Sequence, residues 1–314
     1  MIRGAQPRGG LAETRSVCAL LLAGLCLFSA APGRAADSHP CAEGIELRFS
    51  AQEPTQGSLL LLEVHAAQPL ADLKAAWGKQ TLYFWSDRTA ETATNVHRAL
   101  VGVDLSKPLG LAALTVAAQL DNGERLACSA LLTVQDGKFI VERLRVPRRF
   151  VELSAKNRAR ARREGRLLRE VWAAVTPERL WTGEFHLPVK AVEASGNFGR
   201  RRFLNGQARS PHSGEDFPAP TGTPVRAAQR GRVALARNFF FSGNTVVLDH
   251  GLGLYTFYGH LESMAIKEGE TVEAGALVGR VGATGRVTGA HLHWAVRLNN
   301  TRVNPLDLLA LFSQ

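Results

Sequence analysis

The sequence predicts a mainly β protein in which a basic helix joins two β domains. Three observations support this fold class. Short apolar runs separated by turn signals fill residues 36–150, a charged helical segment occupies residues 151–195, and β-type runs rich in glycine return in residues 196–314. A chain of 314 residues is long enough for two domains that each bury a core.

The first 35 residues have the features of a secretory signal peptide. Three arginines precede an apolar run at 17–31, and small residues at 33–35 suit a cleavage site. We therefore expect an exported protein, periplasmic or associated with the cell envelope, with no transmembrane span after signal cleavage. An uncleaved N-terminal anchor is the alternative. A lipid anchor is not expected, since Leu25 before Cys26 is too bulky for the lipoprotein pattern.

The chain is strongly basic, with a formal net charge of +10. Such an excess favours anionic surfaces, among them cell-wall polymers, membrane headgroups and nucleic acid. The expected export argues against nucleic acid as a partner. Anionic polymers of the cell envelope remain as candidate partners, beside the alternative of a basic surface that is simply solvated.

Residues 36–150 are expected to form an immunoglobulin-like β-sandwich, because their short runs alternate with regular turn signals. The two cysteines that follow the leader, Cys41 and Cys128, flank this domain. In an oxidising compartment they could form a disulfide between its first and last strands, or remain unpaired. The predicted strands of the domain are 44–49, 58–64, 80–85, 111–116 and 130–134.

The segment 151–195 is expected to be a basic helical linker. Ser154 is a candidate N-cap, Thr176-Pro177 is a stop signal, and seven basic residues fall between Lys156 and Arg169. A solvated connecting helix is the favoured interpretation, and a helix that holds anionic wall polymer is the alternative. Apolar residues at four-residue steps could also form a stripe against a neighbouring domain; they are Leu167, Val171 and Val175.

Residues 196–314 are expected to form an antiparallel β-sheet, since no segment among the strands is long enough for a crossover helix. Glycines mark the turns between the runs. The predicted strands are 225–228, 231–236, 244–249, 254–258, 277–281 and 291–297.

Two short histidine spacings in this last domain indicate a metal site. His212 and Asp216 are four residues apart, and His291 and His293 are two apart. Imidazole nitrogen and carboxylate oxygen are zinc ligands, and a catalytic zinc site has three protein ligands and an open position. Residues two apart on a strand point to the same face, so His291 and His293 can reach one pocket. Gly214 removes a side chain where the backbone between His212 and Asp216 must bend.

Several blocks around these spacings resemble the lysostaphin/LytM-type zinc metallopeptidases. They run in order from about residue 198 to residue 309, around a third of the chain, and residues 197–206 resemble the segment leading into this domain in exported members. The matching blocks are Pro211-His-Ser-Gly-Glu-Asp-Phe217, Ala219-Pro-Thr-Gly-Thr-Pro-Val225, Gly253-Leu-Tyr-Thr-Phe-Tyr-Gly-His-Leu261 and Thr288-Gly-Ala-His-Leu-His293.

The resemblance implies roles for five residues. His212, Asp216 and His293 would be the Zn²⁺ ligands, and His260 and His291 would be the catalytic histidines. The implied function is a zinc endopeptidase that hydrolyses the peptide cross-links of bacterial peptidoglycan through a zinc-activated water. Which of the two catalytic histidines is the general base stays open.

Two further alternatives remain at this point. Some relatives have lost their ligands and act as non-enzymatic activators of a cell-wall amidase, but this sequence keeps all five polar positions. The enzyme is therefore the favoured interpretation. Asn205, in the segment before His212, could also approach and block the metal site.

Overall fold

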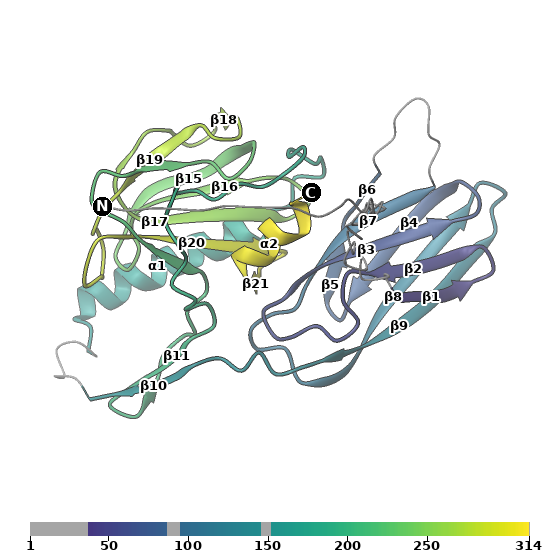
Figure 1. Ribbon diagram of the computed structural model, residues 1–314, viewed down its shortest axis with the longest axis horizontal. Helices are drawn as coiled ribbons and strands as arrows, with labels where there is room; N and C mark the ends of the chain where they lie inside the picture. Colours follow the sequence, from purple (N-terminus) through teal and green to yellow (C-terminus); the bar gives the residue numbers. More distant parts are fainter. Residues whose placement is uncertain (1–36, 87–94, 146–151, 314) are drawn as a thin grey trace, which may run out of the picture. The chain divides into compact units, whose positions relative to one another are not determined.

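The computed structural model describes residues 37–86, 95–145 and 152–313. Its architecture is mainly β, as predicted, with two described helices (Figure 1). The predicted signal peptide lies outside the described residues, so the structure leaves that prediction as it stands. No helix among the described residues has the length and apolar character needed to cross a membrane. The domain boundaries also stay predictions.

The N-terminal half is a sandwich of two antiparallel sheets. Its core contains Leu47, Leu62, Trp77, Leu114 and Leu132, each at most 2% exposed. The first sheet has the order β1 (Asp37–Ala42), β2 (Ile45–Phe49), β3 (Leu59–Ala66), β7 (Val96–Gly102) and β6 (Phe84–Trp85). The second has the order β5 (Gln80–Leu82), β4 (Leu70–Trp77), β8 (Gly110–Leu120) and β9 (Arg125–Val134).

Two details of the sandwich go beyond the sequence prediction. The run predicted as one strand at 80–85 is divided, since β5 pairs with β4 in one sheet and β6 pairs with β7 in the other. The chain therefore changes sheets at Tyr83. A disulfide joins Cys41 of β1 to Cys128 of β9, so it links the first strand to the last across the two sheets.

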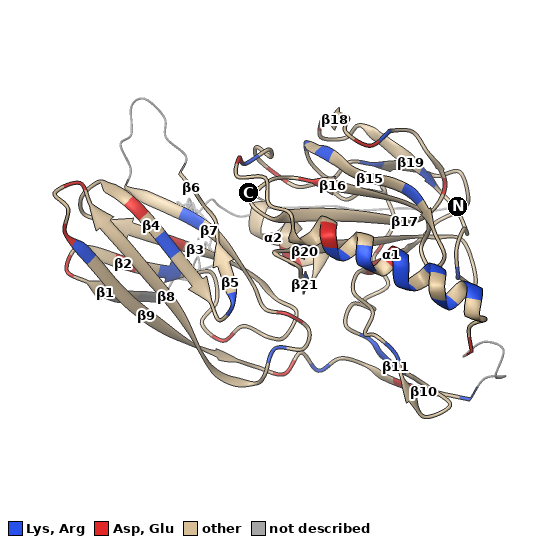
Figure 2. Ribbon diagram, turned by 180° about the vertical axis from the view of Figure 1, so that it is seen from behind, with Lys and Arg blue, Asp and Glu red and all other residues tan. Residues whose placement is uncertain are grey.

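Helix α1 (Ala155–Ala173) begins where the sequence predicts, because the Ser154 side chain accepts a hydrogen bond from the backbone N–H of Asn157. It is not a fully solvated connector. Its apolar side packs on the C-terminal sheet through buried Trp172, whose ring contacts Tyr255 edge-on at 5.4 Å. Leu167 and Val171 join this cluster as the predicted stripe suggested. Basic residues are spread along the helix (Figure 2), and those at 158, 162, 163, 166 and 169 are exposed, whereas Arg160 donates to Asn238 of the sheet.

The C-terminal sheet has nine strands, and all of its ladders are antiparallel, as predicted. Its main path is β13 (Glu215–Pro218), β20 (His291–Leu298), β17 (Leu254–Met264), β16 (Gly243–Asp249), β15 (Gly231–Phe239) and β18 (Thr271–Val272). Strand β14 (Pro224–Arg226) pairs with β19 (Leu277–Val281), and β21 (Thr301–Val303) pairs with β20.

Two smaller elements complete the described chain. A three-stranded sheet of β10 (Val141–Leu144), β11 (Arg201–Leu204) and β12 (Gln207–Ala208) precedes β13 in the sequence. Helix α2 (Pro305–Phe312) ends the chain, with the Asn304 side chain capping its first turn and Pro305 at its first position.

Candidate metal centre and active site

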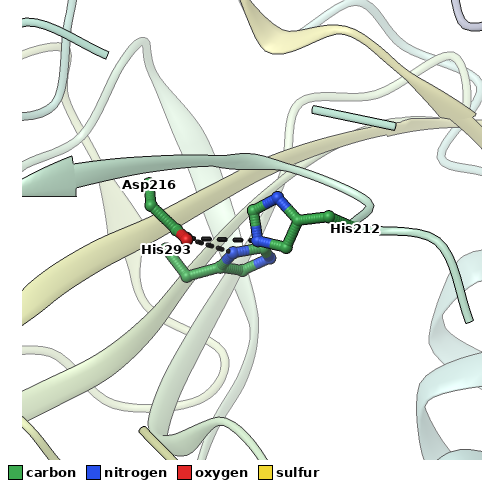
Figure 3. Close-up of side chains that lie close together, drawn as sticks. All are labelled: His212, Asp216 and His293. Carbon is green, nitrogen blue, oxygen red and sulfur yellow. Dashed lines mark hydrogen bonds and ion pairs between the residues drawn. The ribbon is translucent and has the colours of Figure 1, made fainter. Parts of the chain in front are cut away.

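The register of three neighbouring strands brings the predicted ligands together. Asp216 of β13 lies directly opposite His293 of β20, and His293 lies opposite Gly259 of β17. Directly paired residues of an antiparallel ladder point to the same face with their Cβ atoms about 5 Å apart. The side chains of Asp216 and His293 therefore meet on one face of the sheet (Figure 3).

Three ligand atoms converge at this face. Asp216 Oδ1 lies 3.2 Å from His212 Nε2 and 2.9 Å from His293 Nδ1. One ligand atom from each of the three residues lies within 4.8 Å of the other two. Figure 3 shows both imidazole rings turned toward the Asp216 carboxylate. The structure thus brings His212, Asp216 and His293 together, and their function as ligands stays a prediction.

His212 is held by the backbone of a preceding loop rather than by a strand. Its N–H donates to the Arg200 carbonyl at 3.0 Å, and its own carbonyl accepts from the N–H of Gly199 at 2.8 Å. Its Nδ1 lies 3.1 Å from the carbonyl of Asn197. A carbonyl only accepts, so Nδ1 carries a proton and Nε2 is left to face Asp216.

Asn197 holds two of the three candidate ligands, a role that the sequence did not indicate. Its side-chain amide donates to Asp216 Oδ2 at 2.8 Å and accepts from the Asp216 backbone N–H at 3.2 Å, while its backbone carbonyl faces the His212 ring. Asn197 is only 7% exposed. Its own loop is fixed by Glu215, whose carboxylate accepts from the backbone N–H groups of Asn197 and Phe198.

The electrostatics of the cluster keep Asp216 ionised. Burial opposes ionisation, but the neighbouring His212 and His293 rings outweigh it and hold the pKa of Asp216 well below its usual range. Burial lowers the pKa of His293. An ionised carboxylate beside an imidazole held neutral is the protonation state in which both groups bind a metal cation.

Gly214 is needed here for space. It has no positive φ, but a Cβ at this position would lie 2.4 Å from the Trp294 carbonyl oxygen and 2.9 Å from His293 Cε1. The absence of a side chain lets the loop that carries His212 approach β20 closely. The sequence prediction of a glycine at a bend is therefore refined to a glycine at a close contact.

His260 reaches the same site from an irregular stretch of β17. The ladders of β17 change register beside it, between Asn244 and Val246 of β16 and between Leu261 and Ser263 on the β19 side. The φ of His260 is +62°, which is uncommon for a residue other than glycine. Such bulges redirect a side chain and recur beside active sites.

His260 and His291 lie beside each other and beside the ligand cluster. Their ring centroids are 4.8 Å apart, and that of His260 is 6.0 Å from that of His293. The Nδ1 atoms of both rings face carbonyl oxygens, of Thr284 at 3.0 Å for His260 and of Gly289 at 2.9 Å for His291. Each ring is thereby oriented with Nε2 as its free nitrogen.

The two rings differ in their surroundings. Burial and the neighbouring His293 lower the pKa of His260 to about 4, so its ring is neutral at pH 7. The Nε2 atom of His291 lies 3.6 Å from Asp216 Oδ1, which places it at the edge of the ligand cluster. All five residues singled out in the sequence therefore occupy one site, while their individual catalytic roles stay predictions.

Two further residues lie outside this site. His250 is fully buried between the Arg230 carbonyl and the Thr256 hydroxyl and belongs to the core. Asn205 lies in the turn between β11 and β12 with an exposed side chain, and its N–H donates to the Leu144 carbonyl.

Two imidazoles and a carboxylate beside two further imidazoles, on the face of an antiparallel sheet, define a candidate metal-dependent hydrolase. Comparison with protein families agrees with this class. Residues 210–305 match the family described as Peptidase family M23, so this part of the chain is an M23 peptidase domain.

Curated relatives match over the same part of the chain. The peptidoglycan DD-endopeptidase ShyA of Vibrio cholerae is 42% identical over 113 residues, which is 36% of this chain and 26% of ShyA. The DD-carboxypeptidase/endopeptidase Mpg of Neisseria meningitidis is 38% identical over 127 residues, 40% of this chain and 29% of Mpg. The matches thus span little more than a quarter of these relatives' length.

One solved structure resembles the chain over a longer stretch. A crystal structure from Pseudomonas aeruginosa, of a protein named as a candidate M23 peptidase, has a TM-score of 0.63 and 27% sequence identity. The similarity covers 83% of this chain and 96% of that chain. Residues outside 210–305 therefore share the fold of that protein as well.

Proposed function

We propose that this protein is a zinc-dependent endopeptidase that hydrolyses the peptide cross-links of bacterial peptidoglycan. The observation that carries the proposal is the convergence of His212, Asp216 and His293 beside His260 and His291 within an M23 peptidase domain. The name of the relative ShyA, a peptidoglycan DD-endopeptidase, supports the choice of substrate, and the name of Mpg supports endopeptidase activity.

The donor set fits zinc. Zinc accepts imidazole nitrogen and carboxylate oxygen at about 2.0–2.2 Å, so tetrahedral ligands lie roughly 3.3 Å from one another. The separations of 3.2 Å and 2.9 Å around Asp216 Oδ1 are close to this spacing. The Nδ1 proton of His212, directed at the Asn197 carbonyl, is typical of a ligating histidine. When bound, zinc would supply a Lewis acid and lower the pKa of a water molecule toward 7.

The two remaining histidines are suited to proton transfer. His260 is neutral at pH 7 and has its Nε2 lone pair free, so it can accept a proton from the attacking water. His291, whose ring is fixed by the Gly289 carbonyl, can hold a proton for the leaving amine or donate a hydrogen bond to the developing oxyanion. We leave the division of these two roles to experiment.

The test combines metal content with fragment analysis of purified peptidoglycan. We expect Asp216→Ala to lose bound zinc and cleavage together, and His291→Ala to keep zinc but to lose at least about 10²-fold in rate. His186→Ala, which changes an exposed histidine outside the site, is the matched control. Mass spectrometry of the released fragments identifies the broken bond.

Two outcomes would contradict the proposal. If His291→Ala solubilises the wall as fast as wild type, the peptidase hypothesis fails and the non-enzymatic activator of a cell-wall amidase becomes the better interpretation. If Asp216→Ala loses zinc but still cleaves, the metal has no part in the reaction.

We also propose that the protein is exported to the periplasm or cell envelope and that α1 contacts anionic envelope polymers. The support is the predicted leader and the basic side of α1, which carries the exposed residues Arg158, Arg162, Arg163, Arg166 and Arg169 (Figure 2). Co-sedimentation with purified wall should weaken as salt rises and weaken further in Arg162→Gln/Arg163→Gln. Binding that is unchanged by salt and by this variant would exclude the role.

A further inference from the structure

A second cavity adjoins the candidate metal centre and shares His212 with it. It has a volume of about 600 Å³, and four arginines line it: Arg200, Arg202, Arg209 and Arg286. The exposed ring of Phe241 forms part of its apolar wall. Among its described lining residues there is no aspartate or glutamate. We call this cavity the arginine pocket.

Backbone hydrogen bonds connect the arginine pocket to the metal centre. The Arg200 carbonyl accepts from the His212 N–H at 3.0 Å, so a pocket arginine and a candidate ligand are paired through their main chains. The Arg202 carbonyl in turn accepts from the Arg209 N–H at 2.8 Å. The Arg286 N–H donates to the Phe241 carbonyl at 2.8 Å. The backbone segments that carry these arginines are therefore held in place by the fold.

The charge of the pocket is only partly compensated. Glu142 of β10 accepts from Arg200 at 2.9 Å and from Arg202 at 2.8 Å, so one carboxylate serves two guanidinium groups. The side chain of Arg209 donates to the neutral side-chain amide oxygen of Gln207 at 3.3 Å. The three positive charges of Arg200, Arg202 and Arg209 thus face one negative charge among these groups.

Arg200 shows most directly that an acceptor is missing. Its Nε is buried and has no hydrogen-bond partner among the described residues, although its terminal nitrogen is bound to Glu142. A buried N–H group without an acceptor is costly, and such groups in folded proteins usually serve a ligand or water. Arg200, which lines the arginine pocket, therefore has a donor that the described residues do not satisfy.

We propose that the arginine pocket is a substrate subsite that binds a free carboxylate of the peptide whose scissile bond lies at His212, Asp216 and His293. This inference rests on the proposed function and names one feature of its substrate. Guanidinium groups match carboxylates through paired, charge-assisted hydrogen bonds. Binding a carboxylate one pocket away from the metal centre would orient the peptide for attack.

The test measures binding of two probes to the zinc-loaded full chain by calorimetry. The probes are a peptidoglycan stem tripeptide with free carboxylates and the same tripeptide with its carboxylates amidated. We expect the acid to bind at least about tenfold more tightly than the amide. In Arg209→Gln/Arg286→Gln this preference should fall to about twofold or less, because both changes remove a guanidinium group and leave the candidate zinc ligands unchanged.

A matched variant separates local from general charge effects. Arg125→Gln/Arg232→Gln removes the same net charge from exposed positions outside the arginine pocket and outside α1, and should keep the full preference. Thermal unfolding of each variant checks the fold, and the single exposed substitution Arg286→Gln provides a second, milder variant. The proposal is overturned if the preference for the acid persists in the pocket variant. Direct binding of the carboxylate to zinc would give that result. Equal binding of acid and amide to wild type also overturns the proposal.

The subsite and the proposed function can fail independently. If wild type cleaves peptidoglycan but binds acid and amide equally, the endopeptidase stands and the subsite is refuted. If wild type does not cleave but shows the acid preference and loses it in the pocket variant, the carboxylate site stands and the endopeptidase is refuted.

Discussion

At the scale of single residues, the candidate site depends on groups that do not themselves touch the expected metal. Asn197 binds Asp216 through both side-chain atoms and orients His212 through its carbonyl. Thr284 and Gly289 orient His260 and His291 through their carbonyls. Such supporting groups fix the ring orientation and tautomer that a metal ligand or a proton acceptor requires.

Asn197→Ala should weaken metal binding without unfolding the protein. The variant leaves Asp216 Oδ2 without its amide donor, and we expect about 10–100-fold lower zinc affinity. Competition with a fluorescent zinc chelator measures this change. Asn122→Ala, in an exposed turn of the sandwich, is the control and should bind zinc like wild type. Equal affinity in the two variants would show that Asn197 does not position the ligands.

Gly214→Ala should disrupt the site by steric conflict. The added Cβ would meet the Trp294 carbonyl at 2.4 Å, and backbone atoms on β20 cannot move away as a flexible side chain could. We expect a loss of about 1–3 kcal/mol in unfolding free energy, measured by urea denaturation, together with lower zinc affinity. Gly289→Ala is the control, since a Cβ there would meet nothing within 4 Å. A fully stable Gly214→Ala variant that binds zinc normally would contradict the close contact.

At the scale of elements, the sequence predicts what depends on regular periodicity. The two-residue spacing of His291 and His293 correctly indicates a strand, and the four-residue apolar steps of α1 correctly indicate Leu167 and Val171 as packing residues. The position of His260 could not be derived from spacing, because β17 is irregular there and its φ is positive. Only the resemblance to a known family suggested it.

Contacts between irregular segments were also beyond the sequence. Asn197 and Asp216 are 19 residues apart, and His260 and Thr284 are 24 apart. Their hydrogen bonds follow from loop paths that have no repeat or characteristic composition. The division of the predicted strand 80–85 between two sheets has the same origin, since pairing partners rather than local sequence decide it.

The disulfide between β1 and β9 should stabilise the sandwich. It closes a loop of 87 residues, and cross-links of this kind usually contribute about 2–4 kcal/mol by restricting the unfolded chain. Cys41→Ser/Cys128→Ser should therefore lower the unfolding midpoint of the sandwich in calorimetry, and dithiothreitol should shift wild type in the same direction. Zinc affinity should not change, because neither cysteine belongs to the metal centre. An unchanged midpoint would show that the bond contributes no stability.

At the scale of the whole molecule, the buried groups of the C-terminal sheet make folding depend on pH. His250 is fully buried, with Nδ1 at 2.7 Å from the Arg230 carbonyl and Nε2 at 2.8 Å from the Thr256 hydroxyl. A carbonyl only accepts, so Nδ1 carries a proton, and the second ring nitrogen lies against the Thr256 hydroxyl. Burial lowers the pKa of His250 to about 4.

This shift predicts acid destabilisation in a defined range. The unfolded chain binds a proton at His250 below about pH 6.5, whereas the folded chain does so only below about pH 4. The contribution of His250 is fully present above pH 6.5 and is lost as the pH falls toward 4. The loss amounts to roughly 3 kcal/mol. Urea unfolding of metal-free protein across this range measures it.

His250→Gln isolates the contribution of this residue from those of His260 and His293, whose pKa values are also lowered. Glutamine can donate to the Arg230 carbonyl, but it does not titrate. We expect the variant to lose less stability than wild type between pH 6.5 and 4. The slopes of unfolding free energy against pH should differ by at most the value for one bound proton. Parallel pH profiles for the two proteins would show that His250 is not held neutral in the folded state and that the acid sensitivity arises at the metal centre instead.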